Sequence, residues 1–552
     1  MTAAVPLRPL AHAGPWLLRM GPLAVLVAVT VVLGGAGLGV VRLLFVAGCL
    51  AVAWHMLKYG AGAHLSACLA LFCFAPLLRR VVDVSAGYDP SGIMLSGPLL
   101  ALLAPLPQVA AALAARRRFD PALRPFLLAA ACVVYATLLT VFQGDLAQAA
   151  TGALKWGAPV LYGIWLHGEA RRDPRIIESA TLTFMVVMPL AGLYGFMQYL
   201  DPLVWDRYWM VNTTIASIGQ PEPGMVRVFS TMNAPAGYAT FTAAALMLFG
   251  FRRARWGLLL AAAPSVLGLL LSLYRTAWIA LAAGLMIGLL HRRTRGRAAT
   301  LMVAVMALAV AAILLTPAGE MLQERLLTLG NANEDASGQE RLGEYAALME
   351  ADGGTLLGHG FSSTDVMQAG ALAHDGQLVV CWHTMGLVVG ILSVAAVCWA
   401  AWQAMRRAWR SPDVSGVAIS GIMAGALVQV PLAVISSAEI GFLFWSLAAI
   451  GAARRSFIQP PPSLAQGYHG LTSPFPARPT RGKLSQCPAP PVPPASVPLW
   501  RLPSPPRTCV WKTTAPSTPG MRGRSRVGRR TTPCCWSHPG SRTSPASPGT
   551  AW

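Results

Sequence analysis

Four residues could together carry out group transfer from a diphosphate-linked donor: Arg227, Arg275, Arg341 and His374. Arginine binds phosphate oxygens through its planar guanidinium fork and stays charged at every physiological pH. Histidine titrates near neutral pH, which suits a general base. Arginines around a departing diphosphate would stabilise its charge while the histidine deprotonates an acceptor hydroxyl. These residue types therefore fit transfer from a lipid-linked diphosphate donor.

Each of the four also has a simpler structural interpretation. Arg227 could be an ordinary cation beside a membrane segment, and Arg275 could be an interfacial arginine whose charged end reaches water. Arg341 lies among many carboxylates that could pair with it, and His374 could be structural. We favour a functional interpretation for Arg275, because an arginine inside a bilayer costs at least about 3 kcal/mol and needs protein or water around it.

A long polar interval, residues 317–373, contains Arg341 and ends directly before His374. It contains nine Asp and Glu residues but only two arginines, and apolar segments flank it. A capping-box pattern at residues 337–340 predicts a short helix that carries Arg341. His359 and His383 are weaker candidates for chemistry. Because the chain has no CxxC pair and no evident pair of metal-binding carboxylates, we expect neither a metal nor a cofactor.

The composition predicts a protein that crosses a membrane many times. The 552 residues are 55% hydrophobic and 12% charged, whereas soluble domains have roughly 25% charged residues. The net charge of +21 is concentrated in residues 460–552, which contain twelve Lys and Arg and no acid. The remaining cations suit cytoplasmic loops of a membrane protein. We therefore expect a lipid bilayer as partner and no nucleic acid.

Apolar runs long enough to cross a bilayer, which takes roughly 20 residues, follow one another along the chain. They predict about 12–14 transmembrane helices in an all-α fold with a large loop between the later ones. The candidate spans are residues 16–36, 39–57, 61–78, 95–115, 123–142, 151–167, 178–199, 234–251, 256–273, 276–290, 298–316, 377–404, 414–434 and 438–453.

The basic residues of the short loops predict the orientation of these spans. If the spans alternate, the basic runs fall on one side, which should be cytoplasmic: residues 116–118, 171–172, 252–255, 291–297, 406–410 and 454–455. Arg79 and Arg80 are the exception and fall on the outer side. The scheme places two large loops outside, at about 200–233 and 317–373, and both chain ends inside.

Two regions follow from this pattern. Residues 1–457 form the predicted transmembrane domain. Residues 458–552 are rich in Pro, Ser and Arg, have no acid and show no hydrophobic periodicity. Such a segment cannot bury a core, so we expect a disordered cytoplasmic tail.

Three stretches resemble the O-antigen ligase and O-antigen polymerase superfamily of bacterial inner-membrane proteins. The stretch "LSLYRTAWIALAAGLMIGLL" (271–290) is similar to the family's S-x-S-R-x-A-W segment, and "RVFSTMNAPAGYATF" (227–241) is similar to its R-x-x-G-T-F-x-N-P-N segment, with Ser230 in place of the usual glycine. The third stretch is the large polar loop with its G-x-G turn at 358–360 and its closing His374, where Asp375 replaces the usual Asn or Ser.

This resemblance implies a GT-C-like membrane glycosyltransferase that needs no metal. Arg227, Arg275 and Arg341 would bind the diphosphate of an undecaprenyl-diphosphate-linked glycan, and His374 would activate the acceptor hydroxyl. The active site would face the periplasm from the bacterial inner membrane. The acceptor would be lipid A core for a ligase or a growing polysaccharide, as in O-antigen or exopolysaccharide synthesis, for a polymerase.

Other functions remain open at this point. A protein O-oligosaccharyltransferase would differ only in its acceptor. A transporter or flippase of lipid-linked sugars should show inverted repeats and charged residues inside its spans, neither of which is evident. An assembly protein could use the acidic loop as a docking surface, in which case Arg275 would not matter.

Overall fold

The computed structural model describes residues 20–115, 120–251, 256–315, 319–320, 322–323, 356–361 and 376–454. These residues form helices and turns, with no β-strand among them beyond an isolated bridge between Gly219 and Val226. The predicted all-α class is confirmed. The predicted tail at 458–552 and most of the polar loop at 317–373, including the capping box, Arg341 and His374, lie outside the described residues.

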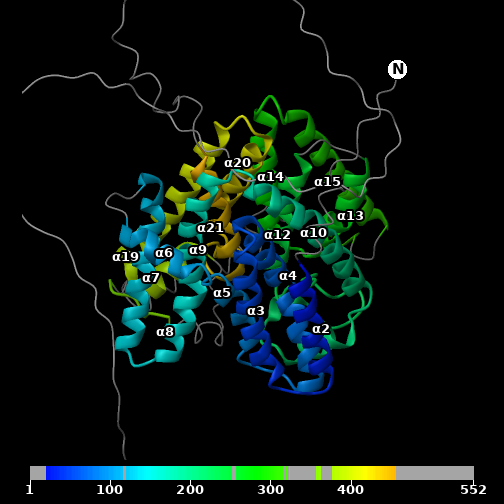
Figure 1. Cartoon of the computed structure of the whole chain (residues 1–552). Helices are drawn as coiled ribbons and strands as arrows, with labels where there is room; N and C mark the ends of the chain where they lie inside the picture. The colour runs from blue at the N-terminus through cyan, green and yellow to red at the C-terminus, as the bar shows by residue number, and fades with distance from the viewer. Residues whose placement is uncertain are drawn as a thin grey trace, which may run out of the picture. The chain divides into compact units, whose positions relative to one another are not determined.

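The helices follow one another along the chain and pack side by side (Figure 1). The first group comprises α2 (Gly21–Gly35), α3 (Val41–Leu57), α4 (Ala61–Ala86), η1 (Ile93–Leu95), α5 (Ser96–Ala101), α6 (Leu106–Ala115), η2 (Pro121–Leu123), α7 (Arg124–Phe142), α8 (Leu146–Gly152), the π-helical turn η3 (Ala153–Gly157) and α9 (Ala158–Arg172). The second comprises α10 (Ile176–Leu200), α11 (Val204–Asn212), η4 (Ala216–Ile218), α12 (Pro235–Gly250), α13 (Trp256–Leu271), α14 (Arg275–Leu290), α15 (Arg295–Leu315), α19 (Gln377–Trp409), α20 (Val414–Gln429) and α21 (Ala438–Ala453).

Several of these helices are membrane-spanning in length and composition. Five helical segments in the described part of the chain meet both criteria: Ala61–Ala86, Pro121–Phe142, Ile176–Leu200, Arg295–Leu315 and Gln377–Trp409. Six shorter apolar helices of 10–17 residues accompany them. The membrane class is thereby supported, while a total of 12–14 spans stays a prediction.

A proline and a glycine interrupt two of the predicted spans. We predicted one helix over 95–115, but α5 ends at Ala101 and α6 begins at Leu106. Pro105 lies between them, has no N–H to donate and disfavours helical geometry at the residue before it. The helix α19 is also interrupted, because Gly386 has φ 77°. A positive φ is readily available to glycine.

Small residues let the later helices approach closely. A Cβ atom on Gly284 of α14 would lie 3.0 Å from the Gly421 carbonyl oxygen of α20, and one on Gly425 would lie 2.6 Å from the carbonyl oxygen of Ala280. Either added methyl group would push the two backbones apart. Glycine and alanine at such crossings are typical of helices that pack inside membranes.

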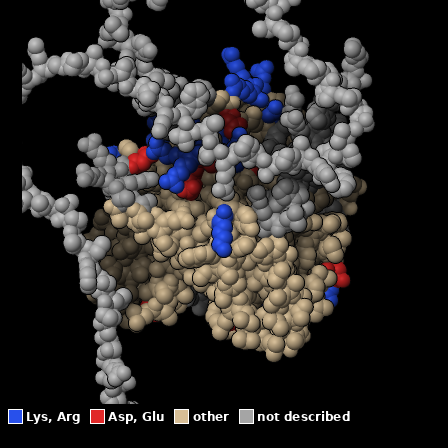
Figure 2. Space-filling view, in the orientation of Figure 1, with Lys and Arg blue, Asp and Glu red and all other residues tan. Residues whose placement is uncertain are grey.

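Several of the predicted basic loops, or described residues directly beside them, contact one another at one end of this bundle. Contacts between them are the hydrogen bonds Arg293 to the Pro412 carbonyl (2.5 Å), Arg297 to Phe251 (2.6 Å) and Arg407 to Ala452 (2.7 Å), and the Arg454–Asp413 ion pair (3.1 Å). Figure 2 shows Lys and Arg gathered mainly at one end of the visible face, above a broad band without charge. The orientation scheme predicts that the basic loops lie together on one side of the membrane, and this basic end agrees with it. The cytoplasmic location of this end stays a prediction.

We predict that acidification weakens this end of the bundle. Burial acts to raise the pKa of Asp413, but the hydrogen bond from Ser415 and the charge of Arg454 outweigh it and hold the pKa below its ordinary value. A depressed folded-state pKa contributes stability above the ordinary pKa, and that stability is lost as pH falls through the folded-state value. Asp413 is 56% exposed, so the loss should stay below about 1 kcal/mol.

Thermal unfolding in detergent measures this effect. Asp413→Asn should lower the midpoint at neutral pH and should remove part of the acid sensitivity below about pH 4. An unchanged acid profile in this variant would show that Asp413 is not the responsible carboxylate.

Candidate functional site

Two arginines near the end of α4 lie inside the protein. The helix continues to Ala86, beyond the predicted end of the span at residue 78, so Arg79 and Arg80 belong to this helix and not to a loop after it. Arg79 is 6% exposed and Arg80 is 0% exposed. A hydropathy pattern ends a span at adjacent arginines, but buried carboxylates compensate both charges here.

Arg80 forms a fully buried ion pair. Its Nε lies 3.0 Å from Oδ1 of Asp206, and neither side chain is exposed. The Tyr194 hydroxyl donates to Oδ2 of Asp206 at 2.7 Å, and the Trp205 indole N–H donates to that hydroxyl at 2.7 Å. Asp206 belongs to α11, within the predicted loop 200–233. The ion pair therefore fastens this loop to the helix bundle.

Arg80 also forms hydrogen bonds to the segment that precedes α12. Its guanidinium group donates to the carbonyl oxygens of Ser230 (2.6 Å) and Met232 (2.5 Å). The same group lies 4.8 Å from the centroid of the Phe229 ring, a cation–π distance. Residues 229–232 belong to the predicted motif 227–241. One buried arginine thus fixes the path of this motif.

Ser230 occupies a backbone conformation that usually favours glycine. Its φ is 54°, which costs an L-residue roughly 1–2 kcal/mol. Hydrogen bonds offset the cost: the Gln198 side-chain oxygen accepts from the N–H groups of Phe229 (3.2 Å) and Ser230 (2.8 Å), and Ser230 Oγ donates to the Ala191 carbonyl (2.5 Å). This is the position where the resembling family has glycine.

The junction between α13 and α14 is a second strained turn. Leu273 has φ 53°. Ser272 Oγ donates to the Leu269 carbonyl at 2.6 Å and accepts from the N–H of Tyr274 at 3.3 Å. The Trp278 indole N–H reaches back to the same Leu269 carbonyl at 3.0 Å. The Ser272 hydroxyl therefore serves the backbone of this turn.

The two strained segments are in direct contact. The N–H of Val228 donates to the Leu271 carbonyl at 3.1 Å, and Nη2 of Arg227 donates to the Leu273 carbonyl at 3.3 Å. Arg275, the first residue of α14, follows Leu273 by two positions. Arg227 and Arg275 are both half-buried. The structure therefore brings together two of the four predicted site residues.

The start of α19 is tied to the segment between α20 and α21. The Gln377 amide donates to Ser436 Oγ at 2.8 Å and accepts from the Ile435 N–H at 2.9 Å. Glu439, a few residues later, faces the beginning of α12: a Cβ atom on Gly237 would lie 3.1 Å from its Oε1. The chain thus re-enters the described structure beside an element that contacts the motif 227–241.

The other two predicted site residues, Arg341 and His374, lie outside the described residues. Gln377, whose position is fixed, follows His374 by three positions.

The predicted G-x-G turn docks onto the break in α19. The N–H groups of His359 and Gly360 donate to the carbonyls of His383 and Thr384, both at 2.9 Å. The imidazole rings of His359 and His383 stack with centroids 4.6 Å apart. A Cβ atom on Gly358 would lie 2.2 Å from the backbone nitrogen of Gly386, and one on Gly386 would lie 2.3 Å from the Leu356 carbonyl oxygen, so this close approach depends on both glycines. The two histidines looked independent in the sequence, and only the turn at Gly386 pairs them.

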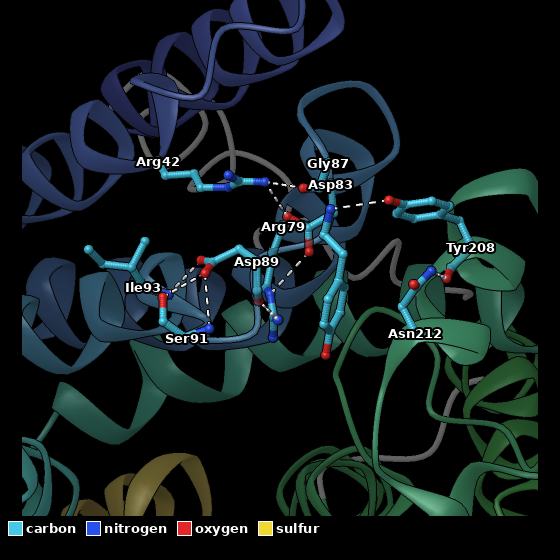
Figure 3. Close-up of polar contacts among 10 residues, drawn as sticks. Arg42, Arg79, Asp83, Gly87, Asp89, Ser91, Ile93, Tyr208 and Asn212 are labelled. Atoms are coloured by element: carbon cyan, nitrogen blue, oxygen red, sulfur yellow. Dashed lines mark hydrogen bonds and ion pairs between the residues drawn. The ribbon is translucent and has the colours of Figure 1, made fainter.

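A second ionic network braces the end of α4. Arg42 of α3 and Arg79 of α4 approach the same carboxylate, Asp83 (Figure 3). The two nitrogen–oxygen distances are 2.9 and 3.3 Å. Asp89 continues the network: burial acts to raise its pKa, but hydrogen bonds from Ser91 and a backbone N–H hold the pKa below its ordinary value. These ion pairs join the end of α4, which carries the buried Arg80, to α3.

No family model matches the chain, and a search of curated proteins found no match either. The likeness to O-antigen ligases and polymerases thus stands on the motifs quoted above. Within the described ranges no group of three or more potential metal ligands is present, and the expectation of a metal-independent reaction stays a prediction.

We predict that the Arg80–Asp206 pair behaves as a coupled unit. Arg80→Met leaves Asp206 buried without its partner, which should cost about 3–5 kcal/mol. In Arg80→Met/Asp206→Leu no charge is left uncompensated, so the double variant should be more stable than the single one. Thermal unfolding in detergent, with exposed Arg406→Met as control, measures both. Wild-type stability of Arg80→Met would contradict the role assigned to the pair.

Proposed function

We propose that this protein transfers a glycan from an undecaprenyl-diphosphate donor to an acceptor hydroxyl, in the polymerisation or ligation of O-antigen or exopolysaccharide. One observation carries the proposal. Two motifs that are separate in the sequence meet at one turn, where the Arg227 guanidinium binds a carbonyl two residues from Arg275. This arrangement brings two cationic side chains to the same junction, as a diphosphate ligand would require.

The proposed reaction is a displacement at the anomeric carbon of the donor sugar. The acceptor oxygen forms a bond to this carbon as the bond to the diphosphate oxygen breaks, and the diphosphate leaves with the electron pair. Arg227, Arg275 and Arg341 would stabilise the charge on the departing diphosphate. His374 would take the proton of the acceptor hydroxyl. Charge neutralisation by arginine makes a metal ion unnecessary in this scheme.

Arg80 has a different part in this proposal. Its guanidinium is fully buried and already binds Asp206 and two backbone carbonyls. It has no surface for a diphosphate, so we assign it as a positioning residue for the Arg227 segment. The two tight turns at Ser230 and Leu273 would serve the same purpose, because left-handed conformations at non-glycine residues often accompany functional sites.

The position of the junction fits a periplasmic active site. The helix α14 begins at the junction with Arg275 and ends at Leu290, directly before the basic residues 291–297. A helix of this length separates its ends by about 24 Å. The proposed diphosphate site therefore lies at the end of α14 away from the basic loop, which the positive-inside rule assigns to the cytoplasm.

Substitution of Arg275 tests this function. In a strain that lacks the native gene, Arg275→Ala should reduce glycan transfer by about 100-fold or more, as for the loss of a transition-state donor. Arg275→Lys should retain part of the activity, because it keeps the charge but loses the fork. Arg295→Ala is the matched control, since this exposed arginine lies beyond the other end of α14. Full transfer by Arg275→Ala at normal protein level would refute the mechanism.

A further inference from the structure

A basic pocket lies at the end of the bundle opposite the α13–α14 junction along α14. The chain turns at 290–293 and 409–412 line an open pocket of about 590 Å³. Three arginines line it, Arg292, Arg293 and Arg410, and none of the lining residues is Asp or Glu. A volume of this size is in the range of small-ligand sites, roughly 300–1,000 Å³.

Direct contacts hold the two turns together. Nη1 of Arg293 donates to the Pro412 carbonyl at 2.5 Å. The rings of His291 and Trp409 meet edge to face with centroids 5.0 Å apart. Thr294 Oγ1 donates to the Gly288 carbonyl at 2.8 Å and closes the end of α14. The walls of the pocket are therefore fixed by the protein itself.

The positive charge of the pocket is not balanced by neighbouring acids that the structure describes. Arg292 and Arg410 are exposed, and their guanidinium groups make no hydrogen bond or ion pair to any described residue. Asp413 follows the second turn directly, but its carboxylate is already engaged by Arg454 at 3.1 Å and by Ser415 at 2.5 Å. The guanidinium groups of Arg292 and Arg410 can therefore bind an anionic ligand that has several oxygen atoms.

The surroundings of the pocket are those of a membrane interface. Leu290, at the rim, is 70% exposed and ends the apolar helix α14, and Trp409 ends the apolar helix α19. Tryptophan is enriched where hydrocarbon meets headgroups. A ligand here would have its anionic part among the arginines and could continue along apolar helix surface. Basic pockets between membrane helices bind anionic headgroups in this way.

We propose that this pocket binds the phosphate of an anionic membrane lipid. The proposal is independent of the glycan-transfer function, because it uses other residues at another end of the bundle. Phosphate is the recognised chemistry, and the exposed apolar rim favours a lipid over free phosphate as its source.

Lipid binding by the purified full chain tests the proposal. Delipidated protein in detergent is titrated with phosphatidylglycerol and with phosphatidylcholine of the same acyl chains, and native mass spectrometry counts the bound lipid. We expect tighter binding of phosphatidylglycerol. Arg292→Gln/Arg410→Gln should weaken it by about fivefold per arginine. Arg293 is left unchanged in this variant because it bridges the two turns.

The matched control is Arg295→Gln/Arg406→Gln, which removes two exposed arginines of the same end that do not line the pocket. Retention of phosphatidylglycerol by this control supports the site, because both variants lose the same net charge. Equal losses in the two variants, or equal binding of both lipids by wild type, would overturn it. Binding of inorganic phosphate that depends on Arg292 and Arg410, without a preference for phosphatidylglycerol, would overturn the lipid assignment.

Discussion

The structure depends on the compensation of one buried charge. Arg80 lies inside the bundle, where an unpaired cation would cost several kcal/mol, and it is stable there because Asp206 and the carbonyls of Ser230 and Met232 surround it. Each of these partners belongs to a segment that hydropathy assigns to an outer loop. The need to pair Arg80 therefore holds α11 and the segment before α12 against α4. That constraint in turn fixes the backbone from which Arg227 reaches the α13–α14 junction.

Sequence patterns predicted the all-α class of the fold, but not the interactions that position Arg227 and Arg275, the two candidate site residues that the structure describes. The apolar runs indicated membrane helices, and Arg227 and Arg275 were singled out because arginines beside such runs are unusual. Arg80 was missed because adjacent arginines normally end a span, and its partner Asp206 is remote in the sequence. The breaks near Pro105 and at Gly386 were missed because hydropathy is insensitive to backbone geometry. A search of the sequence for acids that could pair with Arg79 and Arg80 would have indicated that these two arginines are buried.

The two ends of α14 have different chemistry. At its beginning, half-buried arginines sit on strained turns that are held by a dense set of hydrogen bonds, which suits a site where geometry must be maintained during a reaction. At its end, arginines line an open pocket beside exposed apolar side chains, which suits a site where charge and hydrophobic contact together determine binding. Both proposed sites contain arginine, but in the first the Arg227 guanidinium donates to a backbone carbonyl, whereas in the second Arg292 and Arg410 are exposed.

The pool of lipid-linked glycans in a deletion strain tests the proposed function most directly. Undecaprenyl-diphosphate-linked material is extracted from the deletion strain and from wild type and is compared by size. A glycan transferase predicts accumulation of its unused donor: full-length polymer for a ligase and single repeat units for a polymerase. Restoration of the wild-type pool by the intact gene would assign the effect to this chain. An unchanged lipid-linked pool in the deletion strain would contradict glycan transfer by this protein.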